Sequence, residues 1–214
     1  MYDRNVTFDF TGEIMELSCV TFMGPTVDDG AILDQLPENL RNLLKQTNGF
    51  ILNGGALHVR GACRSPLWHS LGAAWNGEAA FHRIYPSVDA NWIPFAEDCV
   101  GDQFFIADGK VLYLKAETGE VDATTMTLRQ FLDAAEKDPI HALKAEPLLR
   151  FRQEKGDLSE GKLIMAYPPF CTKEAENGVS LAAMDAWELH RFHALLASKL
   201  PPDSSKLEVV VTEQ

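Results

Sequence analysis

The sequence has no long apolar run and no secretory leader. Nowhere do enough apolar residues follow one another to cross a bilayer, although 46% of the 214 residues are hydrophobic. Residues 1–20 also lack the basic-then-apolar order of a signal segment. We therefore expect a cytoplasmic protein that does not act at a membrane. A chain of this length is long enough to bury one sizeable core.

Motifs for metals, redox chemistry and phosphate are missing as well. No CxxC pair occurs, so the cysteines predict neither a zinc ribbon nor a dithiol site, and we expect free thiols at Cys19, Cys63, Cys99 and Cys171. The segment Asn53-Gly54-Gly55 lacks the following lysine of a P-loop and the GxGxxG of a dinucleotide site. The sequence thus predicts no cofactor and no bound metal.

Positive charge is scarce. Lysine and arginine number 19 against 31 aspartates and glutamates, which gives a net charge of −12. The acids concentrate in residues 1–40 and 91–126, whereas residues 41–90 are mildly basic. A charge of this sign repels nucleic acid and membrane surfaces and speeds the encounter with a basic protein. Alternatively, the negative charge has no specific partner and only reflects the acidity common among soluble proteins, which limits their association.

The clearest structural signal is a hairpin around Asp108-Gly109, a favoured two-residue turn. It pairs Phe105 with Leu112 and Phe104 with Tyr113. Alternation places apolar side chains on both faces of this pair. Strands that are apolar on both faces are covered twice, so we expect this hairpin at the centre of the core.

Other segments alternate between helix and strand signals. We expect helices from Pro37 to Asn48-Gly49, around Leu67–Trp75 and after the capping box of Thr127–Gln130, and strands at Phe50–Leu52, Ala56–Arg60 and Leu163–Tyr167. These elements predict an α+β fold with a twisted, antiparallel-rich sheet and flanking helices. We expect residues 1–35 to form an irregular acidic segment packed on a domain at 36–200, followed by a tail at 201–214.

The last helix is expected to start after Ser180. Its apolar stripe would comprise Leu181, Met184, Phe192, Leu195 and Leu196. His190 would then face solvent, and Glu188 would lie on the core side, where it needs a hydrogen bond or an ion pair. His190 and His193 could share a metal, but no HExxH motif supports it.

Two groups of residues are candidates for chemistry. Glu97, Asp98 and Asp102 could hold a metal, transfer protons or decorate a turn; we expect an exposed turn, with a partner-facing acidic patch as the alternative. His58 with Cys63 is the one grouping that resembles a cysteine nucleophile and its base. Nearness in sequence is weak support for such a pair, which is normally assembled across the fold.

Taken in order, four segments resemble the SUKH superfamily, a group of bacterial toxin-immunity proteins and fungal regulators of cell-wall synthesis. They are LPENLRNLLKQTNGF (36–50), IPFAEDCVGDQFFIADGKVLYLKAETGEV (93–121), TLRQFLDAA (127–135) and LIMAYPPF (163–170). The resemblance implies an α+β fold of a twisted sheet packed by helices, with no catalytic residues to carry over. It also implies a role in binding and neutralising a toxin. Residues before Leu36 match nothing in the family's pattern.

From the charge and the resemblance together we expect a non-enzymatic protein-binding module, an immunity protein whose partner is a basic toxin domain. It would act as a monomer or weak homodimer without nucleic acid. The alternatives are a regulatory or scaffold protein of the same superfamily and a small hydrolase or transferase using Cys63 and His58. The expected partner-binding residues are Asp28, Asp29, Trp92, Glu97, Asp98, Asp102, Glu117 and Glu120. Trp68 is a further candidate for an exposed aromatic anchor, but for both Trp68 and Trp92 core packing is the favoured expectation.

Overall fold

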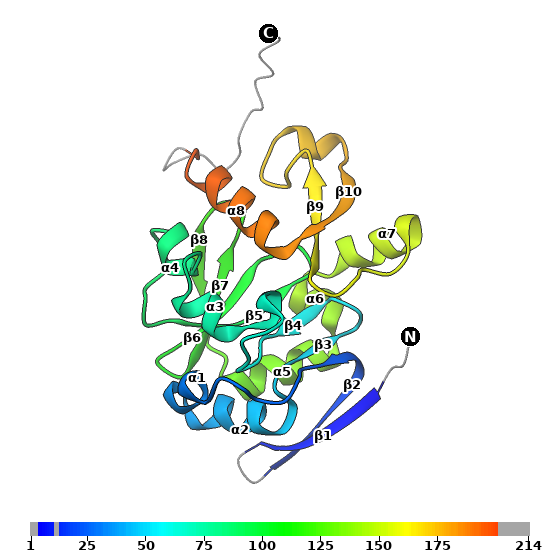
Figure 1. The fold of residues 1–214 in the computed structure, drawn as a ribbon. Helices are drawn as coiled ribbons and strands as arrows, with labels where there is room; N and C mark the ends of the chain where they lie inside the picture. Colours follow the sequence, from blue (N-terminus) through cyan, green and yellow to red (C-terminus); the bar gives the residue numbers. More distant parts are fainter. Residues whose placement is uncertain (1–3, 11–12, 201–214) are drawn as a thin grey trace.

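An eight-stranded antiparallel sheet dominates the computed structural model, which describes residues 4–10 and 13–200. Each strand pairs with the next along the chain, so the spatial order follows the sequence order (Figure 1). The strands are β1 (Arg4–Phe10), β2 (Glu13–Met23), β3 (Phe50–Leu52), β4 (Leu57–Val59), β5 (Ile93–Asp98), β6 (Gln103–Ala107), β7 (Lys110–Lys115) and β8 (Glu120–Ala123). A separate antiparallel pair is formed by β9 (Lys162–Tyr167) and β10 (Ser180–Asp185).

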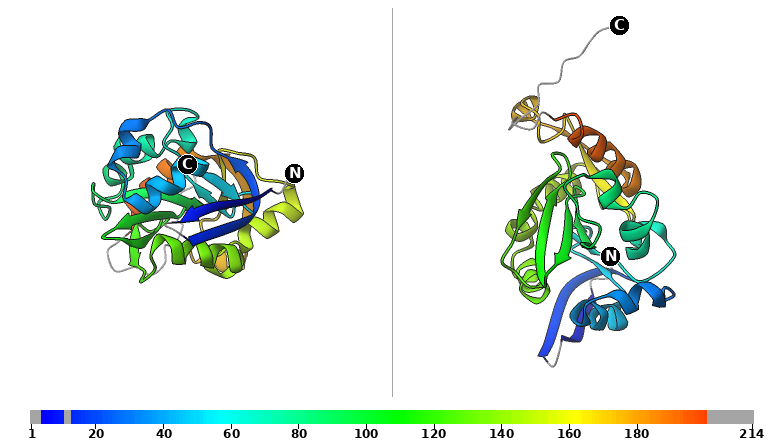
Figure 2. Two further views of the ribbon diagram at one scale, coloured as in Figure 1. Left: turned by 90° about the horizontal axis from the view of Figure 1, so that it is seen from below. Right: turned by 90° about the vertical axis from the view of Figure 1, so that its left-hand side faces the viewer.

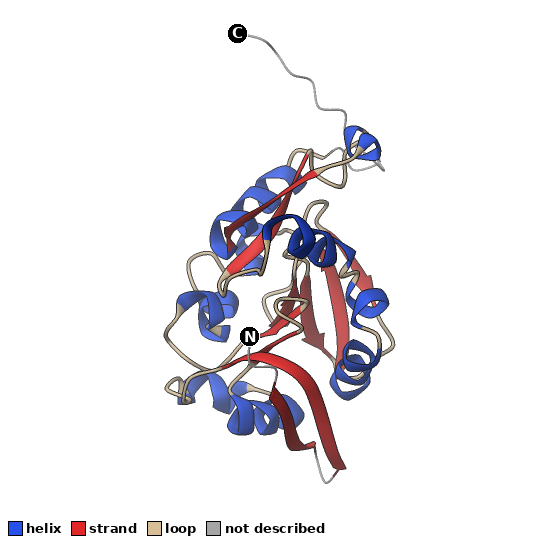
Figure 3. Cartoon of the chain, turned by 90° about the vertical axis from the view of Figure 1, so that its right-hand side faces the viewer, coloured by secondary structure: helices blue, strands red, loops and turns tan. Residues whose placement is uncertain are grey.

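Helices lie on both sides of the sheet, as Figure 3 shows. They are α1 (Gly30–Gln35), α2 (Glu38–Thr47), α3 (Leu71–Asn76), α4 (Phe81–Ile84), α5 (Leu128–Lys137), α6 (Pro139–Leu143), α7 (Glu146–Lys155) and α8 (Ala186–Ala197), with 3-10 turns η1 (Leu67–His69) and η2 (Glu174–Asn177). The α+β class and the antiparallel-rich sheet are confirmed. Across the described residues, no helix is both long and apolar enough to span a bilayer.

The hairpin of β6 and β7 has the predicted register, with Phe105 opposite Leu112 and Phe104 opposite Tyr113. Its two faces enter two different hydrophobic clusters. Phe104 packs on Phe131 of α5, with ring centroids 4.6 Å apart. Phe105 meets Phe81 of α4 on the other face, at 6.0 Å. The hairpin is therefore covered on both sides, as its apolar alternation predicts.

Local helix signals also hold. α2 ends at Asn48, which takes the left-handed conformation (φ 45°, ψ 40°) that stops a helix. α5 starts with a complete capping box between Thr127 and Gln130. The hairpin of β3 and β4 spans the predicted segments. These features depend on residues close in sequence.

The prediction of an irregular N-terminal segment is wrong. Residues 4–10 and 13–23 pair as an antiparallel hairpin that extends the sheet through β3. Phe8, Met15 and Leu17 are buried at its inner face, while Glu16 between them is exposed. This alternation is typical of a half-buried strand. α1 follows, capped by the Asp29 carboxylate.

The prediction for the last helix is also wrong in its start and its orientation. Ser180–Asp185 form strand β10 against β9, and the helix begins at Ala186 behind the capping carboxylate of Asp185. Leu189, His190 and His193 face inward, whereas Phe192 is 38% and Leu195 61% exposed. Figure 2 shows α8 with the β9–β10 pair at the end of the molecule opposite the β1–β2 hairpin. The predicted tail at 201–214 lies outside the described residues.

The start of the helix explains the error in its orientation. Leu181 and Met184 belong to the strand, so they cannot mark a helical stripe. Without them, the buried side of α8 carries two histidines in place of large apolar residues. Glu188 is exposed, which removes the need for a buried partner.

Candidate functional site

Six polar side chains meet in the interior, each at most 5% exposed. They come from β4 and the residues just after it, from η1, from the adjacent strands β5 and β6, and from α8. We call this group the Glu97 cluster; its members are His58, Arg60, His69, Glu97, Gln103 and His190. An unpaired buried polar group costs free energy, and most of these groups bond one another, although His190 Nδ1 is buried without a hydrogen-bond partner.

The Glu97 carboxylate is the hub of the cluster. His58 Nδ1 contacts its Oε1 at 2.8 Å. Its Oε2 accepts hydrogen bonds from Arg60 Nη2 at 2.7 Å, His190 Nε2 at 2.7 Å and Gln103 Nε2 at 3.1 Å. Burial by itself would raise the pKa of Glu97, but the Arg60 guanidinium and the His190 imidazole outweigh it and hold that pKa well below its usual range.

A chain of imidazoles runs from this hub. His58 Nε2 lies 2.8 Å from His69 Nδ1, and His69 Nε2 lies 2.8 Å from the carbonyl oxygen of Asn48. Glu97 and Asn48 are the acceptors at the two ends of this chain, so hydrogen bonds at all three contacts would need three protons. Two neutral imidazoles carry only two. Burial lowers the pKa of His69 to about 3 and also lowers the pKa of His58, which the neighbouring Glu97 opposes. Both shifts favour neutral imidazoles, so the two rings supply two protons to the three contacts.

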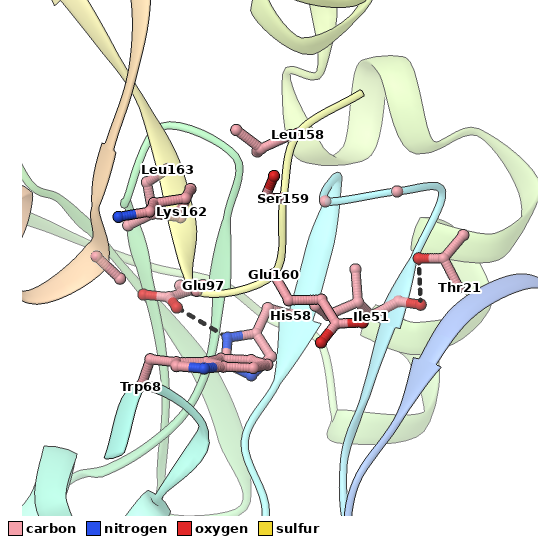
Figure 4. A pocket seen from close by; sticks show the side chains of 14 residues that line it. Thr21, Ile51, His58, Trp68, Glu97, Leu158, Ser159, Glu160, Lys162 and Leu163 are labelled. Atoms are coloured by element: carbon pink, nitrogen blue, oxygen red, sulfur yellow. Dashed lines mark hydrogen bonds and ion pairs between the residues drawn. The ribbon is translucent and has the colours of Figure 1, made fainter. Parts of the chain in front are cut away.

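A cleft of about 480 Å³ opens above part of this cluster. His58, Glu97 and Trp68 lie at its base, and residues 158–163 form a wall (Figure 4). Gly161 of that wall lies directly against Trp68, where a Cβ would come within 2.7 Å of the indole. Because the His58 and Glu97 side chains are only 7% and 2% exposed and bond each other, they reach the cleft by their edges. The arrangement ties β4, β5, η1 and α8 together.

Cys63 and His58 do not form a catalytic pair. Both ring nitrogens of His58 contact Glu97 and His69. Cys63 is buried, and burial together with the carboxylate of Asp28 raises the pKa of its thiol to about 11. A nucleophilic cysteine needs the opposite shift, so the grouping seen in the sequence has no primed thiolate.

The exposed turn predicted at Glu97, Asp98 and Asp102 is wrong. Glu97 and Asp98 are the last two residues of β5, at 1% and 2% exposure. The strand runs further than expected because β4 and β6 pair with it on both sides, placing Glu97 opposite His58 and Gln103. Glu97 can therefore contact a partner only through the base of the cleft.

Three of the predicted partner-binding residues converge elsewhere. Asp98, Asp102 and Glu117 line a second pocket of about 450 Å³, which we call the acid pocket, together with Glu146, Lys115, Lys144, Tyr113, Val100, Pro147, Thr118, Phe170 and Cys171. Burial raises the pKa of all three carboxyl groups, and for Asp98 the nearby Asp102 adds to it. Carboxylates with raised pKa values are stabilised when a cation arrives.

The remaining predicted residues are dispersed. Asp28 is exposed and accepts from the Arg64 N–H, while Asp29 caps α1. Trp92 is half-buried against Phe105. Glu120 is exposed and pairs with Lys115 at 3.1 Å. Glu120 thereby contacts the lining of the acid pocket, because Lys115 belongs to it.

Trp68, the other candidate anchor, is half-buried and packs against Phe22, His58 and His69, with ring centroids 5.1 to 5.4 Å apart. The sequence gives no signal for His69, Arg60 or Gln103 as partners of Glu97, because their contacts cross strands and loops. Among the described residues, no group of three or more histidine, cysteine, aspartate or glutamate side chains is placed to hold a metal ion.

Comparison with known proteins supports the fold alone. No family model and no curated protein matches this chain. The crystal structure of Atu4351 from Agrobacterium tumefaciens is similar, with a TM-score of 0.50 and 11% sequence identity over 82% of this chain and 85% of that one. The chain therefore shares an overall architecture with Atu4351 at low sequence identity.

Proposed function

We propose that this protein is a non-enzymatic protein-binding module of the cytoplasm, an immunity protein that neutralises a basic bacterial toxin by occupying its surface. The observation that carries the proposal is the acid pocket, which gathers Asp98, Asp102 and Glu117 in a chain of net charge −12. The resemblance to the SUKH superfamily supplies the class of partner.

The negative charge of the protein favours binding to a basic partner. A strongly acidic protein attracts a basic partner over a distance of about one Debye length, roughly 8–10 Å at physiological ionic strength. Complementary charge speeds encounter and suppresses wrong partners. An enzyme that acts on nucleic acid presents a basic surface to its substrate, and an acidic module competes for that surface.

The hydrolase alternative receives less support. Its nucleophile, Cys63, is a buried thiol with a raised pKa, and its base, His58, is held by Glu97 and His69. A regulatory or scaffold protein of the same superfamily would differ in the identity of the partner, so the same experiment separates it from an immunity protein.

The test is growth rescue. Proteins encoded next to this gene would be expressed one at a time in a bacterial host, with and without the present protein. We expect one of them to arrest growth, the present protein to restore growth, and the purified pair to dissociate more readily as salt increases. A neighbour that binds without being toxic would favour the regulatory alternative. If the neighbours yield neither a toxin nor a partner, the proposal fails.

A further inference from the structure

We propose that the acid pocket receives a lysine or arginine side chain of the basic partner, and that Asp98 accepts its cationic head. This inference rests on the proposed function for the source of the side chain. The pocket itself is argued from the hydrogen bonds, walls and charges of the residues that line it.

Asp98 has one carboxylate oxygen without a partner. Its Oδ1 accepts from the N–H groups of Val100 and Asp102, both at 3.0 Å. Among the described residues no hydrogen bond or ion pair reaches Oδ2, although the residue is only 2% exposed and lines the pocket. A carboxylate oxygen that has no protein donor, on a residue that lines a cavity, can accept a hydrogen bond from a ligand.

The other two carboxylates are already positioned by donors. Asp102 accepts from the Tyr113 hydroxyl and from the Ala116 N–H. Glu117 accepts from the N–H groups of Phe170 and Cys171, at 3.1 and 2.7 Å. These bonds position both groups in the pocket lining, where Asp102 acts on Asp98 and on Glu117. Burial, with Asp102 nearby, raises the pKa of Asp98, which agrees with a carboxyl group that lacks its cation.

The two lysines of the pocket lining do not pair with Asp98. Lys115 pairs with Glu120 and Asp122, at 3.1 and 3.2 Å. Lys144 lies over the Tyr113 ring at 4.6 Å and donates to its hydroxyl at 3.3 Å. Both lysines belong to the pocket lining, yet neither forms an ion pair with Asp98 within the described part of the chain.

The walls favour a long side chain over a bare ion. Val100, Pro147 and Phe170 give the pocket apolar surfaces. Lysine and arginine bury their methylene stems along such surfaces while the charged head reaches polar partners. Phe170 is 40% exposed, so it is available to contact an incoming chain. A divalent metal ion would gain nothing from these walls.

The first experiment uses the protein without its partner. The ¹⁵N-labelled protein is titrated with Nα-acetyl-arginine amide and, as an uncharged control, with Nα-acetyl-norleucine amide. We expect saturable shifts of the amide signals of Val100 and Phe170 with the arginine probe alone. Asp98→Asn should weaken its binding at least about tenfold, because a charge-assisted hydrogen bond is lost. Asp108→Asn, which changes an exposed carboxylate at the β6–β7 turn outside the pocket lining, is the matched control and should change little.

Three results would overturn the inference: no saturable shift at these amides, equal binding by the Asp98→Asn variant, or shifts produced by magnesium chloride and not by the arginine probe. Should Asp98→Asn fail to fold, Phe170→Ala serves instead, since it removes an exposed wall and should weaken the arginine probe severalfold.

A second experiment separates the pocket from the function. With the partner found by growth rescue, Asp98→Asn should lose both binding and rescue, while Asp108→Asn keeps them. A partner that binds the Asp98→Asn variant as tightly as the wild type refutes the pocket and leaves the proposed function standing. Binding of the arginine probe in the absence of any toxin partner would instead leave the pocket and remove the function.

Discussion

Replacing Glu97 with glutamine tests whether the Glu97 cluster stabilises the fold through charge. The amide keeps the size of the carboxylate and can still hydrogen-bond: its oxygen can accept from Arg60, and its N–H can donate to a neutral His58 Nδ1. What it removes is the negative charge beside Arg60, whose Nη2 lies 2.7 Å from Glu97 in a site where both side chains are at most 2% exposed. The variant thus isolates the cost of an unpaired buried guanidinium.

The expected cost follows from buried ion pairs in general. Removing one partner leaves an uncompensated charge and costs about 3–5 kcal/mol. In a domain of this size that loss lowers Tm by roughly 6–20 °C. Equilibrium urea unfolding followed by circular dichroism would measure the free energy. Glu120→Gln, which breaks an exposed pair with Lys115, is the control and should change stability little.

A double-mutant cycle sharpens the test. If the cost of Glu97→Gln arises from the Arg60 charge, adding Arg60→Met should recover part of it, and the two changes should be non-additive by about 1–3 kcal/mol. A loss below about 1 kcal/mol for Glu97→Gln, or strict additivity with Arg60→Met, would refute the view that this ion pair holds the interior together.

Three further predictions concern residues around the cluster. Asn48→Ala should cost about 2–4 kcal/mol in urea unfolding, because it places a Cβ residue in a left-handed conformation and leaves the buried Ala62 N–H without its acceptor at 2.7 Å; Asn48→Gly should cost less. Burial beside His190 lowers the pKa of His193 to about 3 from 6.5. Because the unfolded chain takes up a proton near pH 6.5 and the folded chain does not, stability should fall with acidification, and His193→Leu should abolish about 2 kcal/mol of the loss between pH 7 and pH 5. Cys63, with its thiol pKa raised to about 11 by burial and Asp28, should resist iodoacetamide in the native protein at about pH 7.5 and react once unfolded; fast native alkylation would contradict the absence of a primed thiolate.

Features set by neighbours in sequence could be predicted. The Asp108-Gly109 turn fixes the register of β6 and β7, and the capping box fixes the start of α5. The order of such signals was enough for the α+β class. The β1–β2 hairpin was also readable in principle, because Met15 and Leu17 alternate with polar residues, although no tight-turn signal of the Asn-Gly kind marks its turn.

The candidate site could not be predicted in the same way. The hydrogen bond from His58 to Glu97 joins residues 39 apart in sequence, and the bond from His190 to Glu97 joins residues 93 apart. Such contacts depend on which strands become neighbours and on where α8 begins. A local cluster of carboxylates in a sequence normally indicates an exposed segment. Glu97 is buried instead, because donors from distant elements satisfy its carboxylate.

Glu97 and Asp98 show why the acid pocket is a better candidate for partner binding than the Glu97 cluster. As consecutive residues of a strand they point to opposite faces, so Glu97 reaches the cluster and Asp98 reaches the acid pocket. Burial raises the pKa of both carboxyl groups. At Glu97 the contacts with Arg60 and His190 outweigh that effect and lower the pKa, whereas at Asp98 the nearby Asp102 raises it further. Glu97, the carboxylate with the lowered pKa, already has a cation in Arg60, and binding another would require displacing it. The carboxylate with a high pKa lacks one, so a basic side chain from outside gains the most free energy on the Asp98 face.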